Sequence, residues 1–221
     1  MIEFDAVTLR RGNQILLDKA SFHIRSGEKV VLTGPSGCGK STVLAAIMGM
    51  FAPSEGNIFF DGKRLSPETV WDARSEIALV GQEPILGAET VREAILLPFE
   101  YKARRHQRPT DDAIIESLRR TGLSPEILEK RSAVISGGEK QRAVVARALL
   151  LENRVFLCDE ATSALDPVSK EAVMRILFAS ERTLLSVSHD PDWIGRCRRV
   201  LSLQDRCVVE VTSGTEKGAI S

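Results

Sequence analysis

The sequence has no excess of charge of either sign and no long apolar run. Lys and Arg together number 30, as do Asp and Glu, in a chain of 221 residues. This balance argues against a protein whose main partner is nucleic acid, because such proteins carry a basic surface. No uninterrupted apolar stretch approaches the roughly 18–20 residues needed to span a bilayer, so we expect no membrane-spanning helix.

The N-terminal segment lacks the charged-then-apolar form of a signal peptide, and the cysteines are not clustered. The segment from Ile2 to Leu9 has the pattern of a strand, not of a charged region followed by an apolar one, so we expect the protein to remain in the cytoplasm. The four cysteines are scattered, which argues against a metal or redox site. The length suits one large α/β domain with an inserted smaller lobe and a core that needs no disulfides.

The most informative motif is a glycine-rich loop that matches the pattern G-x-x-x-x-G-K-[ST]. It lies between a short β-branched run, Lys29–Thr33, and a helix-like segment, Val43–Met48, which is the context that this motif requires. Its backbone N–H groups can turn toward a polyphosphate at a helix N-terminus, where the dipole also favours anions. We expect a solvent-facing Lys40 to reach the β- and γ-phosphates and the Ser41 hydroxyl to bind Mg²⁺. The predicted nucleotide-binding residues of this loop are Gly34, Pro35, Ser36, Gly37, Cys38, Gly39, Lys40, Ser41 and Thr42.

Two adjacent carboxylates follow an apolar run that begins at Val155. Asp159 ends this expected buried strand, which would place it at the C-terminal edge of the sheet, facing Lys40 and Ser41, as a partner of Mg²⁺. Glu160 would point the other way, toward the γ-phosphate, and polarise the attacking water. The alternative is a solvated acidic loop, but the apolar strand before the pair and the phosphate loop upstream favour catalysis.

Three further pieces stand at element boundaries. Gln82 follows the apolar strand Ile77–Val80, and its amide could bind Mg²⁺ or hold a water molecule. Ser136 and the glycines after it open a helix, which makes a second anion-binding surface or simply a capped helix. His189 ends the strand that begins at Leu184, where it could also be an ordinary exposed polar residue.

The ordered set of motifs resembles the nucleotide-binding domain of the ABC ATPases, over residues 2–203. In that family the pieces are called Walker A, the Q-loop (Gln82), the signature motif (136–139), Walker B with its catalytic glutamate, the D-loop (163–166) and the switch histidine (His189). The fold that the resemblance implies is α/β, a P-loop NTPase core with a mostly parallel sheet, an N-terminal antiparallel β subdomain and an inserted α-helical lobe.

The resemblance also implies a mechanism. Two copies of the chain close head to tail on ATP, and the signature of one closes on the ATP held by the Walker A loop of the other. The catalytic residues would be Glu160, His189 and Lys40, and the metal ligands Ser41, Gln82 and Asp159. The additional nucleotide-binding residues would be Arg11, Gln82, Ser136, Gly137, Gly138, Glu139 and Asp166.

Two residues depart from the family pattern. Arg11 stands where an aromatic side chain usually stacks on adenine; a guanidinium can stack on a base, but more weakly. Glu139 replaces the usual final glutamine of the signature. We expect its carboxylate to repel the triphosphate of the partner unless Lys140 or Arg142 offsets the charge.

The predicted organisation is a single ABC ATPase domain. Residues 1–84 and 136–211 form the core with its β subdomain, and 85–135 form the helical lobe, with Thr90 and Thr110 as N-caps and breaks at Gly122 and Pro125. Residues 212–221 are small and polar and are expected to form a flexible tail.

We therefore expect an ATPase subunit that drives a separate membrane permease from the inner face of the cell membrane. The alternative is a soluble ABC ATPase that acts on a cytosolic protein complex; a non-hydrolysing scaffold is disfavoured by the intact Lys40, Asp159 and Glu160. Within the family, the compact length and the segments 86–92, 97–99 and 137–142 most resemble the small ATPase subunits of bacterial iron exporters, which implies metal export.

Overall fold

The computed structural model describes residues 1–211, and the predicted tail at 212–221 lies outside the described residues. The described chain forms two compact units, one made of residues 1–75 and 183–211 and the other of residues 76–182. Among the described residues no helix is long and apolar enough to cross a membrane.

The first unit begins with an antiparallel sheet in the order β2-β1-β4-β5. Its strands are β1 (Ile2–Arg11), β2 (Gln14–Ile24), β4 (Glu55–Phe60) and β5 (Lys63–Arg64). Strand β1 bulges at Ala6, whose φ of 49° interrupts the register with β2. Gly56 on β4 makes room for this bulge, because a Cβ there would lie 2.2 Å from the carbonyl oxygen of Ala6. This sheet confirms the predicted N-terminal β subdomain.

The same unit contains a second group of strands, in the order β10-β9-β3-β8. Strands β8, β3 and β9 are parallel and β10 is antiparallel to β9. The strands are β3 (Lys29–Thr33), β8 (Thr183–Val187), β9 (Arg199–Gln204) and β10 (Cys207–Val211), and the helices are α1 (Lys40–Ile47), α2 (Val70–Ser75) and α7 (Pro191–Arg196). Val30, Val31 and Leu32 are fully buried, as expected for a parallel strand covered on both faces.

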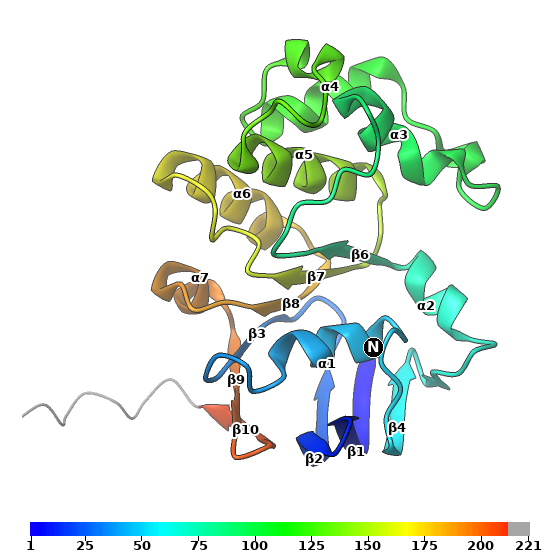
Figure 1. Cartoon of the computed structure of the whole chain (residues 1–221), viewed down its shortest axis with the longest axis vertical. Coiled ribbons are helices and arrows are strands. Elements are labelled where there is room, and N and C mark those ends of the chain that lie inside the picture. Colours follow the sequence, from blue (N-terminus) through cyan, green and yellow to red (C-terminus); the bar gives the residue numbers. More distant parts are fainter. Residues whose placement is uncertain (212–221) are drawn as a thin grey trace, which may run out of the picture. The chain divides into compact units, whose positions relative to one another are not determined.

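The second unit combines two parallel strands with helices. The strands are β6 (Ile77–Val80) and β7 (Val155–Asp159), and the helices are α3 (Val91–Glu100), α4 (Asp111–Arg120), α5 (Gly137–Leu150), α6 (Pro167–Ala179) and the 3₁₀ helices η1 (Arg105–Gln107) and η2 (Pro125–Glu129). Helices α3 and α4 both pack on α5 (Figure 1). The predicted N-caps are confirmed, since the hydroxyls of Thr90 and Thr110 accept hydrogen bonds from the first turns of α3 and α4.

Candidate nucleotide-binding site

The glycine-rich loop leads from β3 into α1 and leaves the start of that helix open. Gly39 is the N-cap, with a φ of 109°, and no side chain caps the helix or adds an acidic group to its first turn. A Cβ on Gly34 would lie 2.5 Å from the carbonyl oxygen of Leu203, so only glycine fits there. The first amides of α1 and the positive end of its dipole are therefore available to an anion.

Lys40 is held across this loop. Its Nζ donates hydrogen bonds to the carbonyl oxygens of Gly34 and Pro35, both at 2.8 Å, and the residue is only 7% exposed. The expectation of a solvent-facing lysine was therefore wrong, because the loop folds its own carbonyls over the ammonium group. Ser41, the next residue, is exposed, so its hydroxyl is accessible to a ligand.

His189 lies in the first unit, at the same edge of the parallel strands as the phosphate loop. Strands β3 and β8 run parallel with Leu32 beside Val187, so the phosphate loop and His189 follow neighbouring strand ends. The side chain of His189 is exposed, while the buried Ser188 accepts a hydrogen bond from the Asp190 amide at 3.1 Å and shapes the turn. Arg11 is also exposed and ends β1, where it pairs with Gln14 across the hairpin.

Three predicted residues meet at one strand edge in the second unit. Strands β6 and β7 are parallel with Val80 beside Cys158, so Gln82, Asp159 and Glu160 follow adjacent strand ends. Glu160 has a φ of 48°, a left-handed conformation that is rare for glutamate. The Ser163 amide and hydroxyl both donate to the Glu160 carbonyl, at 3.1 and 3.0 Å, and hold this turn. Such strain is typical of residues whose position matters more than their stability.

The signature segment forms a complete capping box at the start of α5. The Ser136 hydroxyl accepts a hydrogen bond from the Glu139 amide at 3.2 Å, and the Glu139 carboxylate accepts one from the Ser136 amide at 2.8 Å. Hydrogen bonds from the Ser136 amide and hydroxyl to the carboxyl group, with the charges of Lys130 and Arg142, lower the pKa of Glu139. Of the two residues named above as able to offset this charge, Arg142 contributes, together with Lys130. The structure gives Glu139 a local role in holding the signature serine.

The D-loop lies beside the signature. A Cβ on Gly138 would be 3.6 Å from the carbonyl oxygen of Ala164 and from Leu165 Cδ2. Asp166 then caps α6 by accepting hydrogen bonds from the amides of Val168 and Ser169, both at 3.0 Å. A hydrogen bond with the Ser169 side chain, followed by these amide bonds, lowers the pKa of Asp166. The Asp166 carboxylate is therefore committed to its own helix.

Two residues on α5, which sequence reasoning missed as functional, hold the Gln82 loop at both ends. Gln141 is buried and its Nε2 donates to the Gly81 carbonyl at 3.2 Å. The Arg147 guanidinium donates to the carbonyls of Ile85, Leu86 and Ala94, each at 3.1 Å, and burial lowers its pKa. The sequence signal for this contact is weak, because a polar residue on a helix usually faces solvent.

The model of the ABC transporter family matches residues 17–163. The chain is 33% identical over 92% of its length to the "Probable iron export ATP-binding protein FetA" of Escherichia coli K12, of which it covers 91%. This chain belongs to the ABC transporter family of ATP-binding proteins. The cassette is also 35% identical, over 90% of its length, to "Multidrug resistance protein 3" of Entamoeba histolytica, but spans only 16% of that protein.

Solved structures agree with this membership. The cassette resembles the dimeric post-hydrolysis structure of the ATP-binding cassette MJ0796 bound to ADP and Pi, with a TM-score of 0.83 and 29% identity over 96% of this chain and 98% of that one. The expected fold class is thus confirmed: an antiparallel N-terminal sheet with a mostly parallel sheet and helices. The cassette is an ABC ATPase that binds and hydrolyses ATP to energise transport.

Proposed function

We propose that the cassette works as a head-to-tail homodimer with two composite ATP sites. The observation that carries this proposal is that one chain presents two glycine-rich helix starts, α1 after the phosphate loop and α5 after Ser136, where the capping box of Ser136 and Glu139 leaves the amides of Gly137 and Gly138 for an anion. A single triphosphate needs only one of them. The dimeric structure of MJ0796 supports the pairing by likeness.

Of the residues proposed to act on ATP, the phosphate loop, Lys40 and His189 belong to the first unit, and Gln82, Asp159 and Glu160 belong to the second. Glu160 would orient the attacking water and His189 would contact the γ-phosphate. The partner would supply Ser136, Gly137 and Gly138, with Glu139 holding the serine and Asp166 stiffening the adjacent D-loop. Arg11 would lie against the base.

The ligand set suits Mg²⁺. Ser41, Gln82 and Asp159 offer hydroxyl, amide and carboxylate oxygens, which are the hard donors that this ion prefers, and Ser41 and Gln82 are exposed. Bound Mg²⁺ would neutralise charge on the phosphates. The contribution of the chain is to hold these oxygens at strand and helix ends.

We further propose that the helical lobe, residues 85–135, docks on a separate membrane permease at the inner face of the membrane, and that the cargo is a metal such as iron. The likeness to FetA over nearly the full length of both chains supports this choice. The test is ATPase activity in proteoliposomes that contain a candidate membrane permease, with and without ferrous iron inside or outside. We expect the membrane protein to stimulate the ATPase activity and iron to cross the membrane in the same samples.

The alternative is an ABC ATPase that serves a cytosolic protein complex. Purification of the tagged cassette from its native cells distinguishes the two. If the cassette is recovered with a multi-spanning membrane protein, the transporter proposal is supported. If it is recovered in a stable complex that contains no membrane protein, the cytosolic alternative takes its place.

A further inference from the structure

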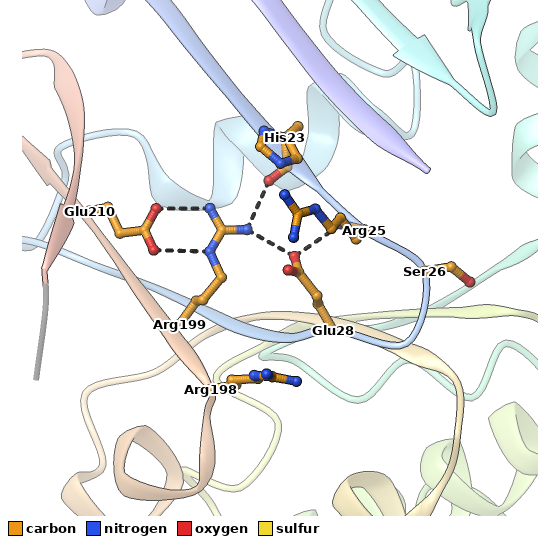
Figure 2. Close-up of a pocket in the computed structure, with 7 residues that line it drawn as sticks. All are labelled: His23, Arg25, Ser26, Glu28, Arg198, Arg199 and Glu210. Atoms are coloured by element: carbon orange, nitrogen blue, oxygen red, sulfur yellow. Dashed lines mark hydrogen bonds and ion pairs between the residues drawn. The ribbon is translucent and has the colours of Figure 1, made fainter.

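A polar hollow of about 480 Å³ lies in the first unit, away from the phosphate loop. Its lining comes from the end of β2, the loop that leads from β2 into β3, the start of β9 and the end of β10 (Figure 2). The phosphate loop follows the other end of β3. Because β3 has five residues, its length separates the hollow from the nucleotide loop by about 16 Å at ~3.3 Å per residue.

Every nitrogen of the Arg199 guanidinium donates a hydrogen bond in this hollow. Its Nε and Nη2 donate to the two oxygens of Glu210, at 3.1 and 2.9 Å, and its Nη1 donates to Glu28 at 2.8 Å and to the His23 carbonyl at 3.0 Å. The Arg199 and Glu28 side chains are only 17% and 14% exposed. The bidentate pair lowers the pKa of Glu210. Both carboxylates of the hollow are thus bound to one arginine.

The other two arginines have no such counter-ion. Arg25 and Arg198 line the hollow, and Figure 2 places them on opposite sides of Glu28. Within residues 1–211 no hydrogen bond or ion pair is made by either guanidinium, although the Arg25 backbone amide donates to Glu28 at 3.0 Å. Three arginines against two carboxylates leave a net positive charge among the lining residues.

We propose that this hollow is an anion site for a phosphomonoester, separate from the ATP site. Arg25 and Arg198 are exposed, and their guanidinium groups would turn from the two sides of Glu28 toward a phosphate in the hollow, since their planar donors match phosphate oxygens. The Ser26 hydroxyl and the His23 imidazole line the same space and can donate hydrogen bonds. The volume exceeds that of a bare phosphate, so it accommodates a phosphorylated small molecule or the headgroup of an anionic lipid.

Histidine resonances make a direct test, because the chain has three histidines in three different places. His23 reports on the hollow, His189 on the nucleotide edge and His106 on the helical lobe. We expect inorganic phosphate and glycerol 3-phosphate to shift the His23 imidazole signals saturably while His106 does not move. Arg25→Gln and Arg198→Gln should each weaken binding roughly tenfold or more, as expected for one lost charge-assisted contact.

The control is Arg64→Gln, which alters an exposed arginine of the same unit outside the hollow and should leave binding unchanged. Flotation with phosphatidic acid vesicles, compared with phosphatidylcholine vesicles, distinguishes a lipid headgroup from a free phosphate. Binding to either source that disappears in the Arg25→Gln/Arg198→Gln double variant supports the site. A His23 shift that persists in that variant, or no response to either source, overturns it. Phosphate effects confined to His189 would also overturn it and would report the ATP site alone.

Discussion

The hydrogen bonds from Arg147 to the loop that follows Gln82 predict how much the free energy of unfolding falls when Arg147 is removed. Arg147→Ala removes three hydrogen bonds of 3.1 Å and leaves the carbonyls of Ile85, Leu86 and Ala94 without this donor. Hydrogen bonds to a charged group contribute about 1.5–3 kcal/mol each, but water can replace part of that at a half-buried site. We therefore expect a loss of roughly 3–5 kcal/mol in the free energy of unfolding.

For a chain of this length that loss lowers Tm by roughly 6–20 °C. Arg147→Lys keeps the charge but not the fork of donors, so it should fold well yet hold the loop at fewer points. We expect this variant to retain ATP affinity while its turnover falls, because Gln82 lies between the loop carbonyls that Gln141 and Arg147 hold. Melting curves, nucleotide titration and ATPase rates measure the three quantities.

The matched control is Arg119→Ala, which truncates an exposed arginine on α4 and should change stability by no more than about 0.5 kcal/mol. If Arg147→Ala melts with the wild type, or if Arg147→Lys loses ATP affinity and turnover in equal measure, the account of α5 as the support of the Gln82 loop is refuted.

Three further predictions concern the nucleotide and the partner. Lys40→Ala should weaken ATP binding by about tenfold or more and also lower the free energy of unfolding by roughly 1–3 kcal/mol, since Lys40 is buried against two loop carbonyls; unchanged affinity in a nucleotide titration would refute the role of this loop in phosphate binding. Arg11→Tyr should tighten ATP binding modestly and raise the preference for ATP over GTP, because an aromatic face stacks better on adenine; if neither changes, the base is held elsewhere. Ile85→Asp, at a residue 73% exposed, should spare basal ATPase activity but reduce stimulation by the permease. It is preferable to reversing Arg92, which pairs with Glu129 at 3.0 Å and Asp111 at 3.1 Å within the lobe; stimulation that survives Ile85→Asp would move the docking surface elsewhere.

The elements that carry the motifs were predictable because local chemistry determines them. Strand β3 and strand β6 have the predicted bounds, and Ser136 begins its helix with a serine hydroxyl as the N-cap. Those features depend on apolar runs, on glycines and on capping hydroxyls a few residues away in the chain.

What the sequence did not reveal depends on contacts between distant residues. The burial of Lys40 follows from the loop folding over its ammonium group, and the role of Arg147 follows from carbonyls that lie about 50–60 positions earlier. The two ion pairs of Arg199, with Glu28 and Glu210, join β9 to β10 and to the loop before β3. Such partners cannot be read from spacing, because a long polar side chain has many candidate partners until the fold selects them.

The central claim is a head-to-tail dimer that closes on ATP, and Glu160→Gln tests it most directly. The substitution keeps the shape of the side chain and removes the carboxylate that would orient water. In sizing chromatography with ATP and Mg²⁺ we expect this variant to elute as a stable dimer that binds ATP without turnover, and to return to a monomer when EDTA removes the metal. A variant that stays monomeric under these conditions, or that hydrolyses ATP at the wild-type rate, would contradict the account.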